Sequence, residues 1–323
     1  MWTAVTLWLV SIGGVALYAR WAAPRLDDGA SLWLVAGGGV VLYFGLIAAL
    51  MAPYFALAWI WRSPRPPDKR IGARGALRLV MNEYRALSGA AKRMMFYRLL
   101  VREPKPAPAA LPVLLVHGVL CNAGVWERFA RYLRRHGASP VYTISYGPPL
   151  ASIDAFADQL ARRIDAILAT TGARQLVVVS HSMGGLVTLA YCRKHGPAKI
   201  RRAIALAPPY RGSVLAWLMF GTCLGQIRPR SAWLETLHAD RFARPPITSI
   251  WSWHDSMVAP QLSSRLPGAD NIELVGVGHN AILADRDARA HVLAAIVAER
   301  ARAGGGATSG SPASAARTPS ARP

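Results

Sequence analysis

Two long apolar segments stand out in the pattern of hydrophobic and polar positions along the chain. Residues 2–19 and residues 31–61 contain no charged side chain. A bilayer core needs about 20 apolar helical residues, so each segment is long enough to span it. The pattern therefore predicts a transmembrane helical hairpin over residues 1–62. Trp59 and Trp61 suit the membrane interface at the end of the second span.

Two alternatives compete with this hairpin. A secretory signal peptide could account for the first segment, but it would need a basic amino-terminal region. Met1, Trp2 and Thr3 carry no basic side chain, and a second apolar segment follows at once. A helix buried in a globular core is the other alternative, and it would require protein on every side.

Residues 63–110 have a different pattern, in which basic and apolar positions alternate with helical spacing. Within residues 72–100, basic side chains fall on one helix face and apolar ones on the other, at ~100° per residue. The basic set is Arg74, Arg78, Arg85 and Lys92, and the apolar set is Leu77, Val80, Tyr84, Leu87, Ala91 and Met94. Such a helix can lie on anionic lipid, pack its apolar face on a neighbouring domain, or do both. A Pro-rich linker over residues 103–110 ends the segment.

Several short apolar segments between residues 111 and 302 have strand patterns, and helix-compatible segments separate them, as in an α/β domain. Residues 303–323 contain mainly Gly, Ala, Ser, Pro and Arg, a composition that predicts a disordered tail. Residues 208–246 form a long, apolar-rich connection between two predicted strands. Such connections are usually short, so the length of this one needs a structural reason.

The segment VVVSHSMGG, residues 177–185, is the most informative motif of the domain. β-branched residues predict a buried strand that ends in a turn of small residues, and a helix pattern follows from Leu186. This strand–turn–helix context is typical of a nucleophile elbow and would expose the Ser182 hydroxyl. The segment resembles the α/β-hydrolase fold, and within it the lipase and esterase group. Over residues 111–302 this resemblance implies a doubly wound, mostly parallel sheet, with a helical cap over residues 208–246. The family pattern is G-x-S-x-G, and Ser180 replaces its first glycine.

A serine nucleophile needs a base, and the base needs an orienting acid. The family order is serine, acid, histidine, and two downstream loops fit this order. The run DSMVAP, which begins at Asp255, resembles the family's acid loop. The run GVGHN places His279 after a short strand, as in the family's base loop. The resemblance therefore implies Asp255 as the acid and His279 as the general base.

Two backbone amides would have to stabilise the oxyanion that forms during acyl transfer. One is expected from Met183, the residue after the nucleophile. The segment VLLVHGVL, residues 113–120, resembles the His-Gly oxyanion loop of bacterial lipases, which implies Val119 as the second donor. His117 would hold that loop, and Trp126 also matches the family pattern.

These features predict a membrane-anchored serine hydrolase of carboxylic esters, most simply lipid-like ones, with no cofactor and no metal. An acyltransferase of the same fold and a non-catalytic membrane scaffold are the alternatives. The net charge of +21 and the isoelectric point near 11.0 could indicate nucleic acid, but no recognition motif accompanies them, and membrane association explains the charge equally well.

The number of basic residues on either side of the hairpin predicts its orientation. Residues 20–30 hold Arg20 and Arg25, whereas residues 62–70 hold four Lys and Arg residues. By the positive-inside rule, both termini and the hydrolase domain face the cytoplasm, in a bacterial inner membrane. We also expect a catalytic unit beginning near Pro104 to function without the anchor, since all the proposed catalytic residues lie beyond it.

Overall fold

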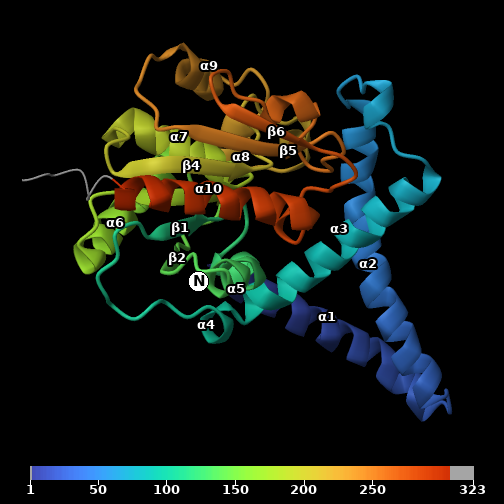
Figure 1. Ribbon diagram of the computed structural model, residues 1–323. Helices are drawn as coiled ribbons and strands as arrows, with labels where there is room; N and C mark the ends of the chain where they lie inside the picture. Colours follow the sequence, from blue (N-terminus) through green and yellow to red (C-terminus); the bar gives the residue numbers. More distant parts are fainter. Residues whose placement is uncertain (1, 306–323) are drawn as a thin grey trace, which may run out of the picture.

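The computed structural model describes residues 2–305. Of the predicted tail, residues 303–305 end the last helix, and residues 306–323 lie outside the described residues. Six parallel strands form one sheet in the order β2-β1-β3-β4-β5-β6 (Figure 1). The strands are β1 (Val113–Val116), β2 (Val141–Thr143), β3 (Leu176–His181), β4 (Ile200–Leu206), β5 (Ile247–Ser252) and β6 (Asp270–Leu274). The order reverses at β1, which is the doubly wound arrangement expected from the sequence.

Helices cover both faces of the sheet. One face carries α6 (Ile153–Thr171) and α7 (Met183–His195), and the other carries α5 (Glu127–Arg135) and α10 (Arg286–Gly305). Side chains alternate along β3, because successive residues of a strand point to opposite faces. Val178 packs with α6 and α7, whereas Val177 and Val179 pack with α5 and α10. Burial on both faces explains the nearly continuous apolar sequence of the central strands.

The long connection between β4 and β5 contains helical segments, as the sequence predicted. They are the 3₁₀ helix η3 (Val214–Leu218), α8 (Thr222–Ile227) and α9 (Ala232–Ala239). Leu224, Leu234 and Leu237 are buried against the main core. Trp217 and Phe220 remain exposed, with 63% and 84% of their surface accessible. The cap therefore packs its base on the domain and presents aromatic side chains outward.

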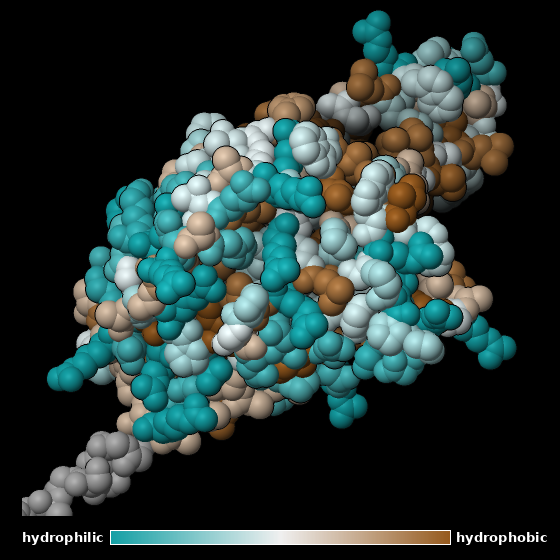
Figure 2. Space-filling model, turned by 90° about the horizontal axis from the view of Figure 1, so that it is seen from above, coloured by the Kyte–Doolittle hydropathy of each residue, from teal (hydrophilic) through white to brown (hydrophobic). Residues whose placement is uncertain are grey.

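The helices α1 (Trp2–Asp27) and α2 (Leu32–Ile60) form a hairpin that projects from the domain (Figure 1). Both are long and apolar enough to cross a membrane, and only 6% of the most apolar stretch of each is buried. Such exposure excludes the buried core helix as an explanation of these segments. Figure 2 shows hydrophobic side chains gathered on this projection, whereas hydrophilic side chains cover much of the body.

Both ends of the hairpin rest on the α/β domain. Near the start of α1, the Thr3 hydroxyl donates to the Cys121 carbonyl at 3.2 Å. Near the end of α2, Ala58 packs with Leu215 and Ala259. The turn between the helices lies far from the domain (Figure 1). The hairpin thus leaves the domain and returns to it.

The basic segment forms α3 (Ala73–Met95), followed by the short α4 (Tyr97–Leu100). α3 contacts α1, α2 and the α/β domain. Its buried positions are Leu79, Glu83, Ala90 and Met94, whereas Leu77 and Val80 are exposed. The packed stripe is therefore rotated from the apolar face that the sequence predicted, and it includes a carboxylate.

Candidate active site

Ser182 lies at the sharp turn between β3 and α7. Its backbone has φ 56° and ψ −128°, a region that a residue other than glycine rarely adopts. The Ser182 amide donates to the Leu206 carbonyl at 2.9 Å, which ties the turn to the neighbouring strand. Strained backbone of this kind persists where the surrounding structure imposes it, and it is typical of functional turns.

Close contacts around this turn explain its small residues. A Cβ atom on Gly184 would lie 2.6 Å from the Val116 carbonyl oxygen, and one on Gly185 would lie 2.7 Å from the Pro208 Cβ. Both distances are too short for any side chain. Ser180, which replaces the family's first glycine, is buried and donates its hydroxyl to the Ile204 carbonyl at 3.4 Å. A serine therefore fits at this position.

Asp255 and His279 lie together at the carboxyl ends of β5 and β6. The His279 Nδ1 atom is 3.0 Å from Asp255 Oδ2 and 3.1 Å from Oδ1, and both side chains are buried. The backbone amides of Met257 and Val258 donate to Asp255 Oδ1 at 2.8 and 2.7 Å. These two donors fix the carboxylate, and the carboxylate in turn orients the imidazole.

The surroundings of His279 act on its pKa in opposite directions. Burial disfavours the charged imidazolium and lowers the pKa. The charge of Asp255, its hydrogen bond and the more distant charge of Glu83 favour the imidazolium, and the net pKa is raised above the ordinary value of 6.5. The site therefore stabilises the protonated histidine that a general base becomes during reaction.

Ser182 and His279 line one cavity of about 260 Å³. Among the described residues, no hydrogen bond links the Ser182 hydroxyl to the imidazole. Catalytic hydrogen bonds are often long or poorly aligned in unliganded sites and tighten when substrate binds. The other walls are mostly apolar and include Val119, Leu215, Met219, Leu224 and Ile227.

The proposed oxyanion residues lie beside the nucleophile. Met183 is the first residue of α7, so its amide is one of those that have no partner within the helix. Val119 follows Gly118, where an added Cβ would lie 2.8 Å from the Ser182 Cβ. His117 stacks on Tyr146 with ring centroids 4.1 Å apart, and the Tyr146 hydroxyl donates to the His117 carbonyl. This packing holds the loop against Ser182.

Two further histidines near the site are neutral. Burial lowers the pKa of His117 to about 4, and burial together with the neighbouring His279 lowers that of His181 to about 3. His181 Nε2 lies 2.9 Å from the His279 carbonyl oxygen, so the neutral ring donates there. His181 thus positions the loop that carries His279.

The sequence did not reveal Glu83, a buried carboxylate from α3 that reaches the same loop. It accepts hydrogen bonds from the backbone amides of Asn280 and Ala281, the Asn280 side chain and the Ser256 hydroxyl, at 2.8 to 3.0 Å. A Cβ on Gly278 would lie 2.4 Å from a Glu83 oxygen. One side chain therefore joins the loops of Asp255 and His279.

Residues that precede the linker also complete the cavity. Tyr54 from α2 and Leu87 and Met94 from α3 line it together with Ser182. The Tyr54 hydroxyl contacts Met219 Sδ at 3.4 Å, which links α2 to the cap. A chain that begins near Pro104 would keep Ser182, Asp255 and His279 but would lack these three lining side chains.

Within residues 2–305, no group of three or more His, Cys, Asp and Glu side chains has a geometry that could hold a metal ion.

A doubly wound parallel sheet with a strained serine after β3 and a helical cap after β4 defines the α/β-hydrolase fold, and the chain has this fold. Residues 112–254 match the family described as alpha/beta hydrolase fold. A lipase of Bacillus licheniformis in its mature form is 17% identical over 57% of this chain and 91% of its own, with a TM-score of 0.50. Lipase B of Aspergillus fumigatus is 23% identical over 63% of this chain and 57% of its own, with a TM-score of 0.54. At these identities the likeness concerns the fold.

Proposed function

We propose that this protein is a membrane-anchored serine hydrolase that cleaves carboxylic esters with an apolar acyl group. The observation that carries the proposal is the buried contact of Asp255 with His279 beside the strained Ser182, all at the carboxyl ends of parallel strands. This is the region of an α/β sheet in which ligands bind.

The reaction follows the geometry. Ser182 Oγ attacks the ester carbonyl while His279 Nε2 accepts the hydroxyl proton, and Asp255 stabilises the resulting imidazolium. The amides of Val119 and Met183 bind the oxyanion. The tetrahedral species collapses to an acyl-enzyme, and the alcohol leaves with the proton from His279. Water, deprotonated by the same histidine, then releases the carboxylic acid.

The apolar walls of the cavity support an acyl substrate, because an apolar lining favours an apolar ligand over water. Exposed α1 and α2 support insertion into a bilayer, where their apolar side chains lose contact with water. The basic residues that follow α2 support a cytoplasmic domain. An integral anchor would keep the active site close to lipid esters.

Labelling with a fluorophosphonate probe tests the chemistry. The full-length protein should be labelled, and Ser182→Ala should abolish both labelling and hydrolysis of a p-nitrophenyl ester series. Ser180→Ala is the matched control, since it removes the neighbouring buried hydroxyl, and it should remain labelled. Labelling that persists in Ser182→Ala would place the nucleophile elsewhere. Retention in membranes through carbonate washing tests the anchor separately.

A further inference from the structure

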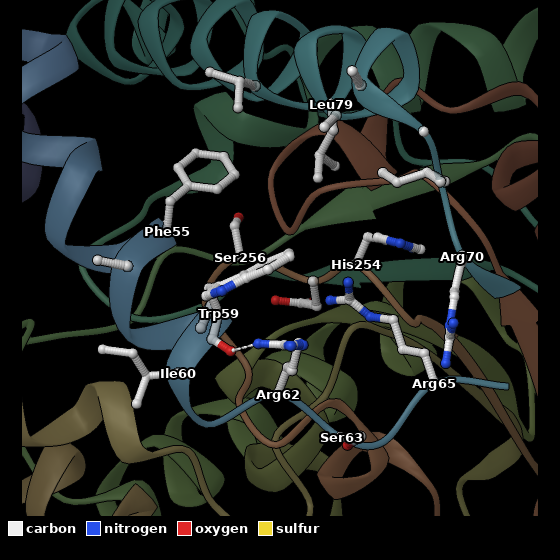
Figure 3. Close-up of a pocket in the computed structure, with 18 of the residues that line it drawn as sticks. Phe55, Trp59, Ile60, Arg62, Ser63, Arg65, Arg70, Leu79, His254 and Ser256 are labelled. Carbon is white, nitrogen blue, oxygen red and sulfur yellow. Dashed lines mark hydrogen bonds between the residues drawn. The ribbon is translucent and has the colours of Figure 1, made fainter. Parts of the chain in front are cut away.

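A second and larger cavity, of about 960 Å³, lies between the end of α2 and the start of α3 (Figure 3). Its inner wall includes His254, Asp255 and Ser256, from the loop that follows β5. It has no lining residue in common with the cavity of Ser182. It is therefore a separate site that touches the back of the catalytic acid loop.

One side of this cavity is apolar. Phe55, Trp59 and Ile60 come from α2, and Leu79 comes from α3 (Figure 3). Val80 of α3 also lines the cavity. Trp59 and Ile60 are 59% and 64% exposed, although both lie at the end of the apolar second helix. Aromatic residues at this position suit the membrane interface. Trp59, Ile60 and Val80 thus give this wall apolar surface that protein does not cover.

The other side carries three arginines. Figure 3 shows Arg62 and Arg65 with their guanidinium groups turned toward the same part of the cavity and Arg70 beside them. Arg62 donates to the Trp59 carbonyl at 2.6 Å, and Arg65 donates to the Trp253 carbonyl at 2.8 Å. Neither contact supplies a negative charge. Within residues 2–305, none of the three forms an ion pair.

Other charged groups nearby do not neutralise these arginines. Asp68 and Glu273 form ion pairs with Lys69. The Asp255 carboxylate is hydrogen-bonded to His279 and to two backbone amides. Burial, and then the neighbouring charge of Arg62, lowers the pKa of Arg65. Burial and Arg65 lower the pKa of His254 to about 4, so this histidine is neutral. The cavity therefore has unbalanced positive charge beside an apolar wall.

We propose that this cavity binds one anionic phospholipid, with the headgroup phosphate on Arg62, Arg65 and Arg70 and an acyl chain along Phe55 and Trp59. Guanidinium groups form charge-assisted hydrogen bonds with phosphate oxygens. In a zwitterionic headgroup, the positive group partly neutralises the phosphate charge, so these hydrogen bonds are weaker. A free phosphate would leave the apolar wall in contact with water, whereas a lipid covers both parts. The proposal shares with the proposed function only the membrane placement of α2.

Native mass spectrometry of the full-length protein in detergent tests the proposal without turnover. The protein is titrated with phosphatidylglycerol or with phosphatidylcholine of the same acyl chains. The wild type should retain one phosphatidylglycerol in preference to phosphatidylcholine. The double variant Arg62→Gln/Arg70→Gln should weaken this retention about 10-fold or more, since two charge-assisted contacts are lost.

The matched control is Arg74→Gln/Arg78→Gln, which removes the same charge from exposed positions of α3 outside the cavity. It should behave as the wild type. Equal retention by the two double variants, or no headgroup preference, would overturn the proposal. Glycerol phosphate at millimolar concentration should not displace the lipid, and full displacement would identify a soluble phosphate site instead. Ser182→Ala should bind lipid normally, so a failure of the catalytic proposal is distinguishable.

Discussion

Glu83 and Asn280 lie 197 residues apart in the chain, yet the Glu83 carboxylate accepts hydrogen bonds at 2.8 Å from both the backbone amide and the side chain of Asn280. Asn280 directly follows His279. The contact therefore connects α3, outside the region that matches the α/β-hydrolase family, to the position of the proposed base. α3 therefore supports the loop that carries His279 and is not only a link to the hairpin.

Glu83→Gln should lower kcat for a soluble short-chain ester. A glutamine keeps the size of the side chain but replaces one acceptor oxygen with an NH₂ group. That donor would face the Asn280 and Ala281 amides and the Asn280 side chain, which also donate. The His279 loop should shift, and small displacements of catalytic groups cost on the order of 10- to 100-fold in rate. Steady-state kinetics measure the effect. Glu235→Gln on exposed α9 is the matched control, and an equal effect of both variants would contradict a positioning role.

The same variant should change the pH dependence of kcat/KM. His279 must be neutral to accept a proton, so activity falls as the pH drops through its pKa, which the site raises. Glu83 contributes to that increase. Removing its charge lowers the pKa of His279 and moves the acid limb of the profile to lower pH. An acid limb that stays in place, or moves to higher pH, would show that Glu83 acts by packing alone.

A chain that begins at Pro104 should lose most of its activity, even on a soluble ester. It lacks Glu83 and the three side chains that close the cavity, Tyr54, Leu87 and Met94. A chain that begins at Ser63 keeps α3, so it should retain more of the activity. Thermal unfolding of both chains separates loss of the site from loss of the fold. Full turnover by the shorter chain would restore the view of a separable anchor.

The sequence predicted the sheet, the cap and the contact of Asp255 with His279 because each depends on local patterns. The central strands β1 and β3 are nearly continuous apolar runs, and the acid and base loops carry short motifs at strand ends. Glu83 could not be found in this way. Its partners lie far away in sequence, and helical periodicity assigns a carboxylate to the exposed face. α3 packs against α1, α2 and the α/β domain, and together these contacts decide which of its side chains are buried. A single helical period describes only one buried face.

Gly118→Ala should abolish most activity with a smaller effect on the fold. The new Cβ would lie 2.8 Å from the Ser182 Cβ and 3.3 Å from its Oγ, so either the nucleophile or the oxyanion loop must move. We expect a loss of kcat/KM of about 100-fold or more, because loss of oxyanion contacts has that size. Gly225→Ala in α8 meets no atom within 4 Å and should leave kcat/KM unchanged. Equal kinetics for both variants would contradict the assigned position of the oxyanion loop.

The hairpin should place its turn across the membrane from the catalytic domain. Thr3 and Ala58 rest on the α/β domain. Asp28 follows α1 in the turn between the helices, and this turn lies far from the domain (Figure 1). A membrane-impermeant thiol reagent should therefore label Asp28→Cys and Ala107→Cys from opposite sides of sealed vesicles. Cys192 and Cys223 are buried and Cys121 is partly buried, so labelling of the unmodified chain gives the background. In inside-out vesicles of known orientation, the positive-inside rule expects labelling at residue 107. Labelling of both positions from one side would show that α1 and α2 do not span the bilayer, even if the chemistry at Ser182 is correct.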